Sequence, residues 1–183
     1  RLFQSVDQTW REHMQKTFED PAVLSVARRQ GFLQALQDAN AKLDVIQKGL
    51  NDYLETKRLA FPRFYFLSND ELLEILAETK DPLRVQPHLK KCFDGISQLE
   101  FQPNLDITAC LDPGDERIDF PYEQHAMVNP NNSGGNVERW LVEVEIMMKK
   151  GLAYSIDTSM VDHASSDRLD WVHKWPGQVS LCQ

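Results

Sequence analysis

The sequence predicts a mostly α-helical protein, an elongated helical bundle with a small antiparallel β-meander inserted around residues 96–120. Apolar residues recur at helical spacing through residues 1–93. The period then changes to short alternating runs, and helical spacing returns after residue 136. We therefore expect residues 1–183 to be a single fragment with a helical part, a meander and C-terminal helices over 136–183.

The longest regular segment predicts one helix over about residues 32–58. Leu36, Leu43 and Leu50 are seven residues apart, as in a helix that packs along its length against other helices. At 1.5 Å per residue, such a helix is on the order of 40 Å long. A helix of this length in a chain of 183 residues predicts an elongated module.

Shorter helices are expected on either side of the long one. Residues 2–18 carry a helical apolar pattern, and Asp20 followed by Pro21 is typical of a capped start for a helix over 22–30. Near the other end, we expect a loop over 157–165 before the last helix.

The predicted meander consists of short strands separated by turn residues. Pro and Asn occupy 103–104, and the Asp-Pro-Gly-Asp turn at 112–115 places the tip at Pro113–Gly114. One face of this sheet is expected to be solvated. The acidic side chains predicted on it are Asp106, Glu116 and Asp119.

The stretch from Phe61 to Leu76 (FPRFYFLSNDELLEIL) predicts a strand, a helix cap and an amphipathic helix in sixteen residues. Proline at position 62 ends the preceding helix, and the aromatic run over 63–67 favours a short strand. Ser68 and Glu71 have the spacing of a capping box, in which each side chain bonds the other's backbone amide.

We predict that this junction is a structural keystone of the fold. Phe64 and Phe66 alternate with Tyr65, so both phenylalanines are expected on one buried face of the strand. The predicted keystone residues are Phe61, Pro62, Phe64, Phe66, Ser68 and Glu71.

Composition excludes several classes of protein. The net charge of −8 argues against nucleic-acid binding and against an anionic membrane surface. No apolar run approaches the roughly 20 residues of a membrane span. Cys92, Cys110 and Cys182 lack metal or disulfide spacing, so we interpret them as buried, reduced thiols.

No pattern in the chain predicts catalytic, cofactor-binding or metal-binding residues. The sequence has neither a GxxxxGK(S/T) phosphate loop nor a GxGxxG run, and its five histidines lack metal spacing. The acidic residues over 112–119 lack the spacing of a calcium loop. Four tryptophans lie at helical spacing, for which core packing is favoured over a partner-binding anchor. They are Trp10, Trp140, Trp171 and Trp175.

Four blocks of this sequence resemble the linker of dynein heavy chains. The segment 61–76 closely resembles the family's FPRF(F/Y)F-LSNDELLEIL run, and YLETKR at 53–58 resembles the YLE-KR that precedes it. The segments 79–93 and 171–179 are similar to the next block and to the family's W-WPGQV run. The amino-acid sequence of these blocks is more similar to axonemal than to cytoplasmic dyneins. Residues 112–136 match the family only loosely.

The resemblance implies that the fragment is a middle part of an elongated, mostly helical arm. In the family this arm joins the tail to a ring of six AAA+ ATPase modules, and its straightening delivers the power stroke. The fragment itself would be no enzyme and would need no cofactor, since ATP and Mg²⁺ belong to the ring of the parent chain. Its partners would be ring modules of the same heavy chain, and the parent would act on microtubules with other dynein chains in a ciliary or flagellar axoneme.

Two exposed features are candidates for contact with the ring. One is the hairpin tip, with Asp112, Asp115, Glu116 and Arg117, and the other is the helix face that carries Lys57 and Arg58. Polar contacts of this kind suit an arm that docks reversibly. The alternative, which is all that periodicity supports unaided, is a generic helical interaction module without a motor role.

Overall fold

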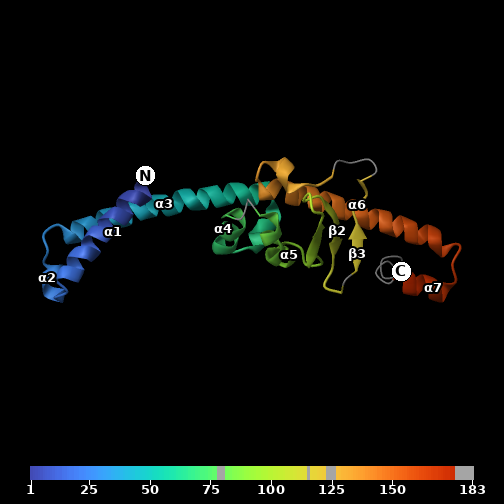
Figure 1. Ribbon diagram of the computed structural model, residues 1–183, viewed down its shortest axis with the longest axis horizontal. Coiled ribbons are helices and arrows are strands. Elements are labelled where there is room, and N and C mark those ends of the chain that lie inside the picture. The colour runs from blue at the N-terminus through green and yellow to red at the C-terminus, as the bar shows by residue number, and fades with distance from the viewer. Residues whose placement is uncertain (78–80, 115, 123–126, 176–183) are drawn as a thin grey trace. The chain divides into compact units, whose positions relative to one another are not determined.

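A computed structural model describes residues 1–77, 81–114, 116–122 and 127–175. Most of these residues are helical, and three short strands form one antiparallel sheet (Figure 1), which confirms the predicted class of a mostly α protein with a small meander. The chain divides into two compact units, Arg1–Thr56 and Lys57–Gln183. The division falls within one long helix.

Unit 1 is built from α1 (Leu2–Glu19), α2 (Val23–Ala27) and most of α3 (Phe32–Ala60). Lys42 on α3 donates a hydrogen bond of 2.9 Å to the Ser5 hydroxyl on α1. At the closed end of the pair, the rings of His13 and Phe32 meet edge to face at 5.0 Å. The chain thus folds back on itself as two antiparallel helices joined by a short helical turn.

The second helix, expected over 22–30, is shorter than predicted, because it spans only Val23–Ala27. The helix α2 begins at Val23, because the Asp20 carboxylate accepts hydrogen bonds from the Ala22 amide and the Ser25 hydroxyl and so closes a turn before the helix. Pro21 therefore lies in that turn, ahead of the first helical residue.

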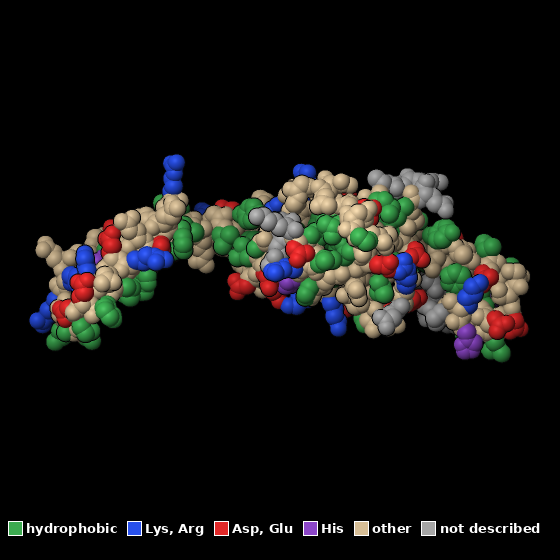
Figure 2. Space-filling model, in the orientation of Figure 1, with side chains coloured by type: hydrophobic (Ala, Val, Ile, Leu, Met, Phe, Trp, Pro, Cys, Tyr) green, Lys and Arg blue, Asp and Glu red, His purple; other side chains and the backbone are tan. Residues whose placement is uncertain are grey.

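Unit 1 exposes much apolar surface, which appears as hydrophobic side chains over α1 and α2 in Figure 2. Two antiparallel helices leave one side of each helix uncovered, so such exposure follows from the geometry. A groove of about 310 Å³ runs between α1 and α3. Trp10 lines this groove and is 55% exposed, so core packing was the wrong expectation for it.

Unit 2 contains the sheet, with strand order β1-β2-β3 (Gln98–Phe101, Ile107–Leu111 and Arg117–Asp119). Both pairings are antiparallel, with Leu99 opposite Cys110 and Cys110 opposite Ile118. The predicted turn residues 103–104 and 112–114 lie between the strands, as expected. A bridge from Ile107 to Val128 extends the pairing beyond the strands.

One long helix, α6 (Val137–His163), packs against this sheet. The predicted loop over 157–165 is wrong, because the helix continues through His163 before α7 (Arg168–Lys174) begins. Serine and threonine in this last stretch bond back to carbonyls one turn earlier: Thr158 donates to Tyr154. The Thr158 hydroxyl is thus satisfied inside the helix.

The remaining elements of unit 2 connect α3 to the sheet and the sheet to α6. They are η1 (Pro62–Phe66), α4 (Asn69–Ala77), η2 (Pro82–Val85), α5 (Gln86–Cys92) and η4 (Pro130–Ser133). The largest fully buried side chains of the unit include Phe61, Phe64, Leu72, Leu99 and Leu141. Trp140 and Trp171 are buried, as their helical spacing predicts.

Candidate functional site

The junction that the sequence marked as a keystone is a 3-10 turn, so the predicted strand over 63–67 is wrong. Pro62 sits at the first turn of η1, where its fixed φ suits a helical start and its missing amide hydrogen costs nothing. Phe61 before it is extended, with φ −137° and ψ 94°. In a 3-10 helix, successive side chains point in different directions around the helix axis. They therefore do not alternate between two faces, as the side chains of a strand would.

This winding separates the two phenylalanines. Phe61 and Phe64 are fully buried and meet edge to face at 5.0 Å. Phe66, which was expected in the core, is 71% exposed, and Tyr65 is 51% exposed. Phe66 therefore does not belong to the buried keystone. The first half of the turn does belong to it.

The capping box forms as the spacing predicts. The Ser68 amide donates to the Glu71 carboxylate at 2.9 Å, and the Glu71 amide donates to the Ser68 hydroxyl at 3.3 Å. Lys91 on α5 also donates to Glu71. This bond, together with the Ser68 amide, lowers the pKa of Glu71 to about 2.

Arg63 occupies the centre of the junction, a role that the sequence did not reveal. Its guanidinium donates to the Cys92 carbonyl at 3.1 Å, pairs with Glu145 on α6 at 3.4 Å and lies 4.8 Å from the centre of the Phe93 ring. Lys149 pairs with Glu145 as well, and the two cations lower the pKa of that carboxyl. Arg63 thus ties η1 to α5 and to α6.

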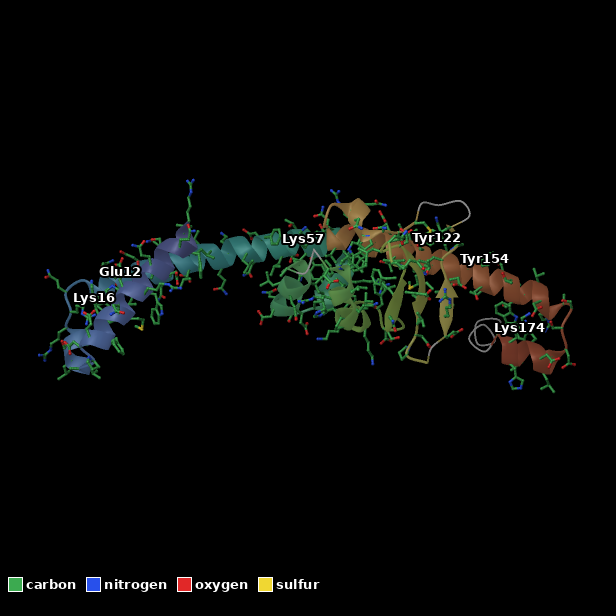
Figure 3. All side chains as sticks on the ribbon, viewed as in Figure 1. Glu12, Lys16, Lys57, Tyr122, Tyr154 and Lys174 are labelled. Atoms are coloured by element: carbon green, nitrogen blue, oxygen red, sulfur yellow. The ribbon has the colours of Figure 1, made fainter. Side chains whose placement is uncertain are left out.

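Lys57 and Arg58 were expected on an exposed helix face, but Lys57 is largely buried and Arg58 is half-buried. Lys57 lies on α3 in Figure 3, and its ammonium group donates to Glu138 on α6 at 2.6 Å. Only 16% of the Lys57 side chain and 9% of the Glu138 side chain are exposed. Arg58 donates to the Leu67 carbonyl and to Asn69 at 2.8 Å. Both cations are thus engaged within unit 2.

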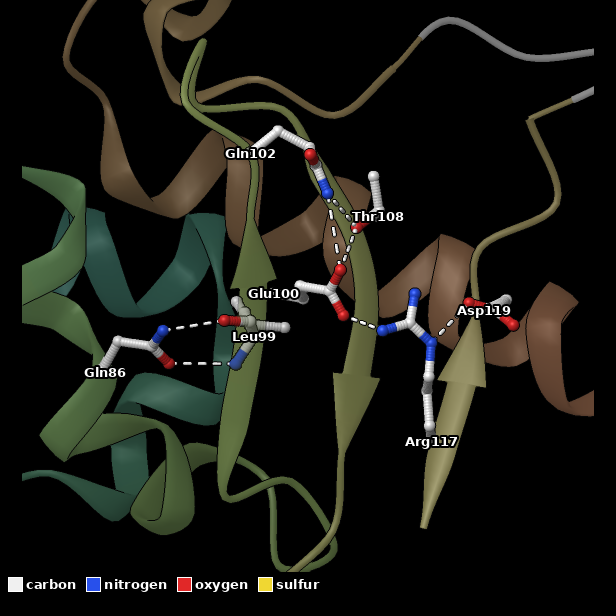
Figure 4. Close-up of polar contacts among 7 residues, drawn as sticks. All are labelled: Gln86, Leu99, Glu100, Gln102, Thr108, Arg117 and Asp119. Carbon is white, nitrogen blue, oxygen red and sulfur yellow. Dashed lines mark hydrogen bonds and ion pairs between the residues drawn. The ribbon is translucent and has the colours of Figure 1, made fainter. Parts of the chain in front are cut away.

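The sheet carries a polar network over its three strands (Figure 4). Arg117 on β3 pairs with Glu100 on β1 and with Asp119, so it is less available for docking than we expected. Thr108 and Gln102 complete the network around Glu100. On the other side of β1, Gln86 forms two hydrogen bonds with the Leu99 backbone, at 2.8 and 2.9 Å.

At the hairpin tip, Asp112 closes the turn. Its carboxylate accepts from the amides of Gly114 and Glu116, at 2.7 and 2.8 Å. Glu116 is exposed, as expected. Asp115 lies outside the described residues. Of the predicted ring-contact set at the tip, Glu116 and Arg117 are the described side chains that are exposed, and Arg117 is also paired with Glu100 and Asp119.

The thiols that the structure describes offer no reactive centre. Cys92 and Cys110 are buried and free, and burial raises the pKa of each to about 11. Cys182, like the run at 176–179, lies outside the described residues. Over the ranges that the structure covers, no three His, Cys, Asp or Glu side chains are placed to hold a metal ion. No helix in the described part has an apolar stretch long enough to cross a bilayer.

Comparison with known proteins agrees with these observations. Residues 1–159 match the family described as "Dynein heavy chain, N-terminal region 2". The whole chain is 52% identical over 182 residues to human dynein axonemal heavy chain 12 and 49% identical over 182 residues to human dynein axonemal heavy chain 3. It is 45% identical over 185 residues to mouse dynein axonemal heavy chain 1.

These relatives are far longer than the chain, which spans 6% of the first and 4% of the other two. The family match covers unit 1, the FPRFYF turn and the sheet, and it ends within α6. This chain belongs to the dynein heavy chain family and corresponds to part of its N-terminal region 2.

Proposed function

We propose that this segment is part of the linker of an axonemal dynein heavy chain and works as a mechanical lever arm. It transmits the ATP-driven conformational change of an AAA+ ring to the tail, for microtubule-based movement of a cilium or flagellum. ATP and Mg²⁺ act in the ring of the parent chain, and the segment itself is no enzyme. Its partners are ring modules of the same heavy chain, and the parent works with other dynein chains.

The observation that carries this proposal is α3, a single helix of 29 residues in a chain that matches dynein heavy chains over its whole length. A helix resists bending because each residue is held by a backbone hydrogen bond to the next turn. Through its last turns α3 is tied to α6 by Lys57 and to the junction by Arg58. A force applied to α3 would therefore reach the core of unit 2 through fixed contacts.

The test is to interrupt α3 at an exposed residue in the whole heavy chain. Lys48→Pro removes a helical hydrogen bond and should cost roughly 3 kcal/mol of helix stability. Lys48→Ala removes the same side chain and keeps the helix, and is the matched control. We expect the proline variant to hydrolyse ATP while its microtubule gliding slows severalfold, with the alanine variant unchanged. If both variants glide like the wild type, α3 transmits no force.

A further inference from the structure

We propose that Asp94 is a modification site, at which aspartate converts spontaneously to isoaspartate through a succinimide. Asp94 and Gly95 form the turn between α5 and β1, and both residues are exposed. The reaction needs no enzyme and no cofactor, only a carboxyl group, the amide nitrogen of the next residue and water. It is independent of the proposed lever-arm function.

The reaction joins the Asp94 side chain to the backbone of the next residue. The Gly95 amide nitrogen attacks Cγ of the protonated Asp94 carboxyl, a nitrogen–carbon bond forms, and the carboxyl hydroxyl leaves with the amide proton as water. A second water molecule then opens the five-membered ring at either carbonyl. Opening at the backbone carbonyl leaves the main chain running through Cβ and Cγ, which is isoaspartate. Opening at the side-chain carbonyl restores aspartate.

The geometry of this turn leaves the attacking nitrogen unbonded. The Ile96 amide donates to the Phe93 carbonyl at 3.2 Å, so Asp94 and Gly95 are the two central residues of a β-turn. The peptide group between the central residues takes no part in the hydrogen bond that closes the turn. The Gly95 amide accordingly has no hydrogen-bond partner among the described residues.

Glycine at position 95 favours ring closure. To reach the Asp94 carboxyl, the nitrogen must move with the central peptide plane of the turn. Glycine tolerates both the negative and the positive φ through which this rotation passes. A Cβ atom at position 95 would meet nothing within 4 Å, so neighbouring atoms also leave room for the movement.

The aspartates in other turns and strands differ from Asp94 in this respect. Three of them precede a proline, which has no amide hydrogen, and two precede residues whose amides donate to backbone carbonyls. The first three are Asp20, Asp81 and Asp112, and the other two are Asp106 and Asp119. Asp167 accepts from the Leu169 amide at 2.9 Å and precedes the bulky Arg168. Asp94, in contrast, combines a following glycine with an unbonded amide.

Isoaspartate at this position should disturb the link between α5 and the sheet. Phe93 and Ile96 flank the turn and are only 2% and 3% exposed, so the turn cannot shift freely to absorb an additional main-chain atom. Beyond the turn, the Leu99 backbone is held by two hydrogen bonds with Gln86 (Figure 4). We expect the added atom to weaken these bonds, so that the Leu99 amide exchanges with solvent faster in the modified protein.

Ageing of the whole heavy chain in heavy-oxygen water tests the proposal. Each opening of the succinimide adds one oxygen atom from the solvent, and electron-transfer fragmentation distinguishes isoaspartate from aspartate. In the native protein at neutral pH, we expect the label and isoaspartate to accumulate at Asp94 and not at Asp44. Asp44 is the internal control, because it lies inside α3, where the next amide is bonded within the helix. Labelling of Asp94 that is no faster than that of Asp44, or that needs unfolding in urea, would overturn the proposal.

Two substitutions identify the attacking atom. Gly95→Ala should slow the reaction severalfold, because the new methyl group hinders the nitrogen. It should leave the fold intact, since φ at Gly95 lies outside the left-handed region and the added Cβ has room. Asp94→Glu should abolish the reaction, because ring closure would then need a six-membered ring. Equal ageing of the wild type and Gly95→Ala would contradict attack by the Gly95 amide and would also overturn the proposal.

Discussion

Phe64 and Phe66 are two residues apart in one turn, and their environments are opposite. Phe64 is fully buried against Phe61, whereas Phe66 is 71% exposed. Phe64→Ala should lower the free energy of unfolding by roughly 3–5 kcal/mol, because it leaves a cavity in the core. Phe66→Ala should lower it by less than about 0.5 kcal/mol. Urea unfolding of the two variants measures this difference, and equal losses would contradict the assignment of the two side chains.

The capping box gives a second prediction at the scale of residues. Ser68→Ala should cost about 1 kcal/mol through the loss of the hydroxyl that accepts from the Glu71 amide. Ser68→Thr keeps the hydroxyl and should cost less. A thermal melt of both variants separates the lost cap from a general effect of substitution at this position.

The depressed pKa of Glu71 makes its contribution dependent on pH. The pKa of about 2 in the folded protein lies below the ordinary glutamate pKa of 4.5, so folding favours the charged form. The resulting stabilisation is present above pH 4.5 and is lost as the pH falls toward 2. Compared with the wild type, Glu71→Gln should be less stable at pH 6, and the two should converge near pH 2. A difference in stability that stays constant over this range would show that the charge is irrelevant.

At the scale of elements, the packing of α6 on the sheet depends on a close approach at Gly151. A Cβ atom at this position would lie 2.6 Å from the Asp119 carbonyl oxygen and 2.8 Å from a methyl carbon of Ile118. Gly151→Ala should therefore push the helix away from β3, at roughly 1–3 kcal/mol. Gly49→Ala on α3 is the control, because a Cβ there meets nothing within 4 Å. The prediction is wrong if both substitutions stabilise the protein.

The ion pair between Lys57 and Glu138 joins α3 to α6 inside unit 2. One oxygen of Glu138 accepts from Lys57, and the other is buried without a hydrogen-bond partner. Lys57→Met should cost roughly 3–5 kcal/mol, since it leaves a buried carboxylate unpaired. The double variant Lys57→Met with Glu138→Leu should recover most of this loss. Denaturation of the single and double variants measures the coupling, and simple additivity would contradict it.

At the scale of the whole molecule, a ring-contact role of the hairpin tip can be tested in a complete motor. Charge reversal at Asp115 and Glu116 should slow microtubule gliding and leave the fold intact, because charges at the rim of a contact tune its association rate. Reversal of Asp157, an exposed acidic residue on α6 away from the tip, is a control for the general effect of charge. Gliding at wild-type velocity at both low and high salt would show that the tip is only a solvated turn.

Whether a feature of this molecule could be predicted from the sequence depends on how far apart in the chain the residues that determine it lie. The limits of α1 and of the long helix, the region of the meander and the Ser68 capping box depend on residues within a few positions of each other, so the sequence predicted them closely. The strand expected at 63–67 and the loop expected at 157–165 were wrong. In both places the local composition favoured one state, and packing on the rest of unit 2 favoured another.

The candidate site shows the same division. The sequence by itself determined the family, the helical class and the position of the aromatic junction, because these depend on the order of residues within short segments. Only the tertiary structure decided that Phe66 faces solvent, that Lys57 is engaged with Glu138, and that Arg63 joins three elements. Partners of this kind are some 80 positions apart in the chain, as the 57–138 and 63–145 pairs are. Such contacts arise only when the chain closes around a shared core, and periodicity within a single segment carries no information about them.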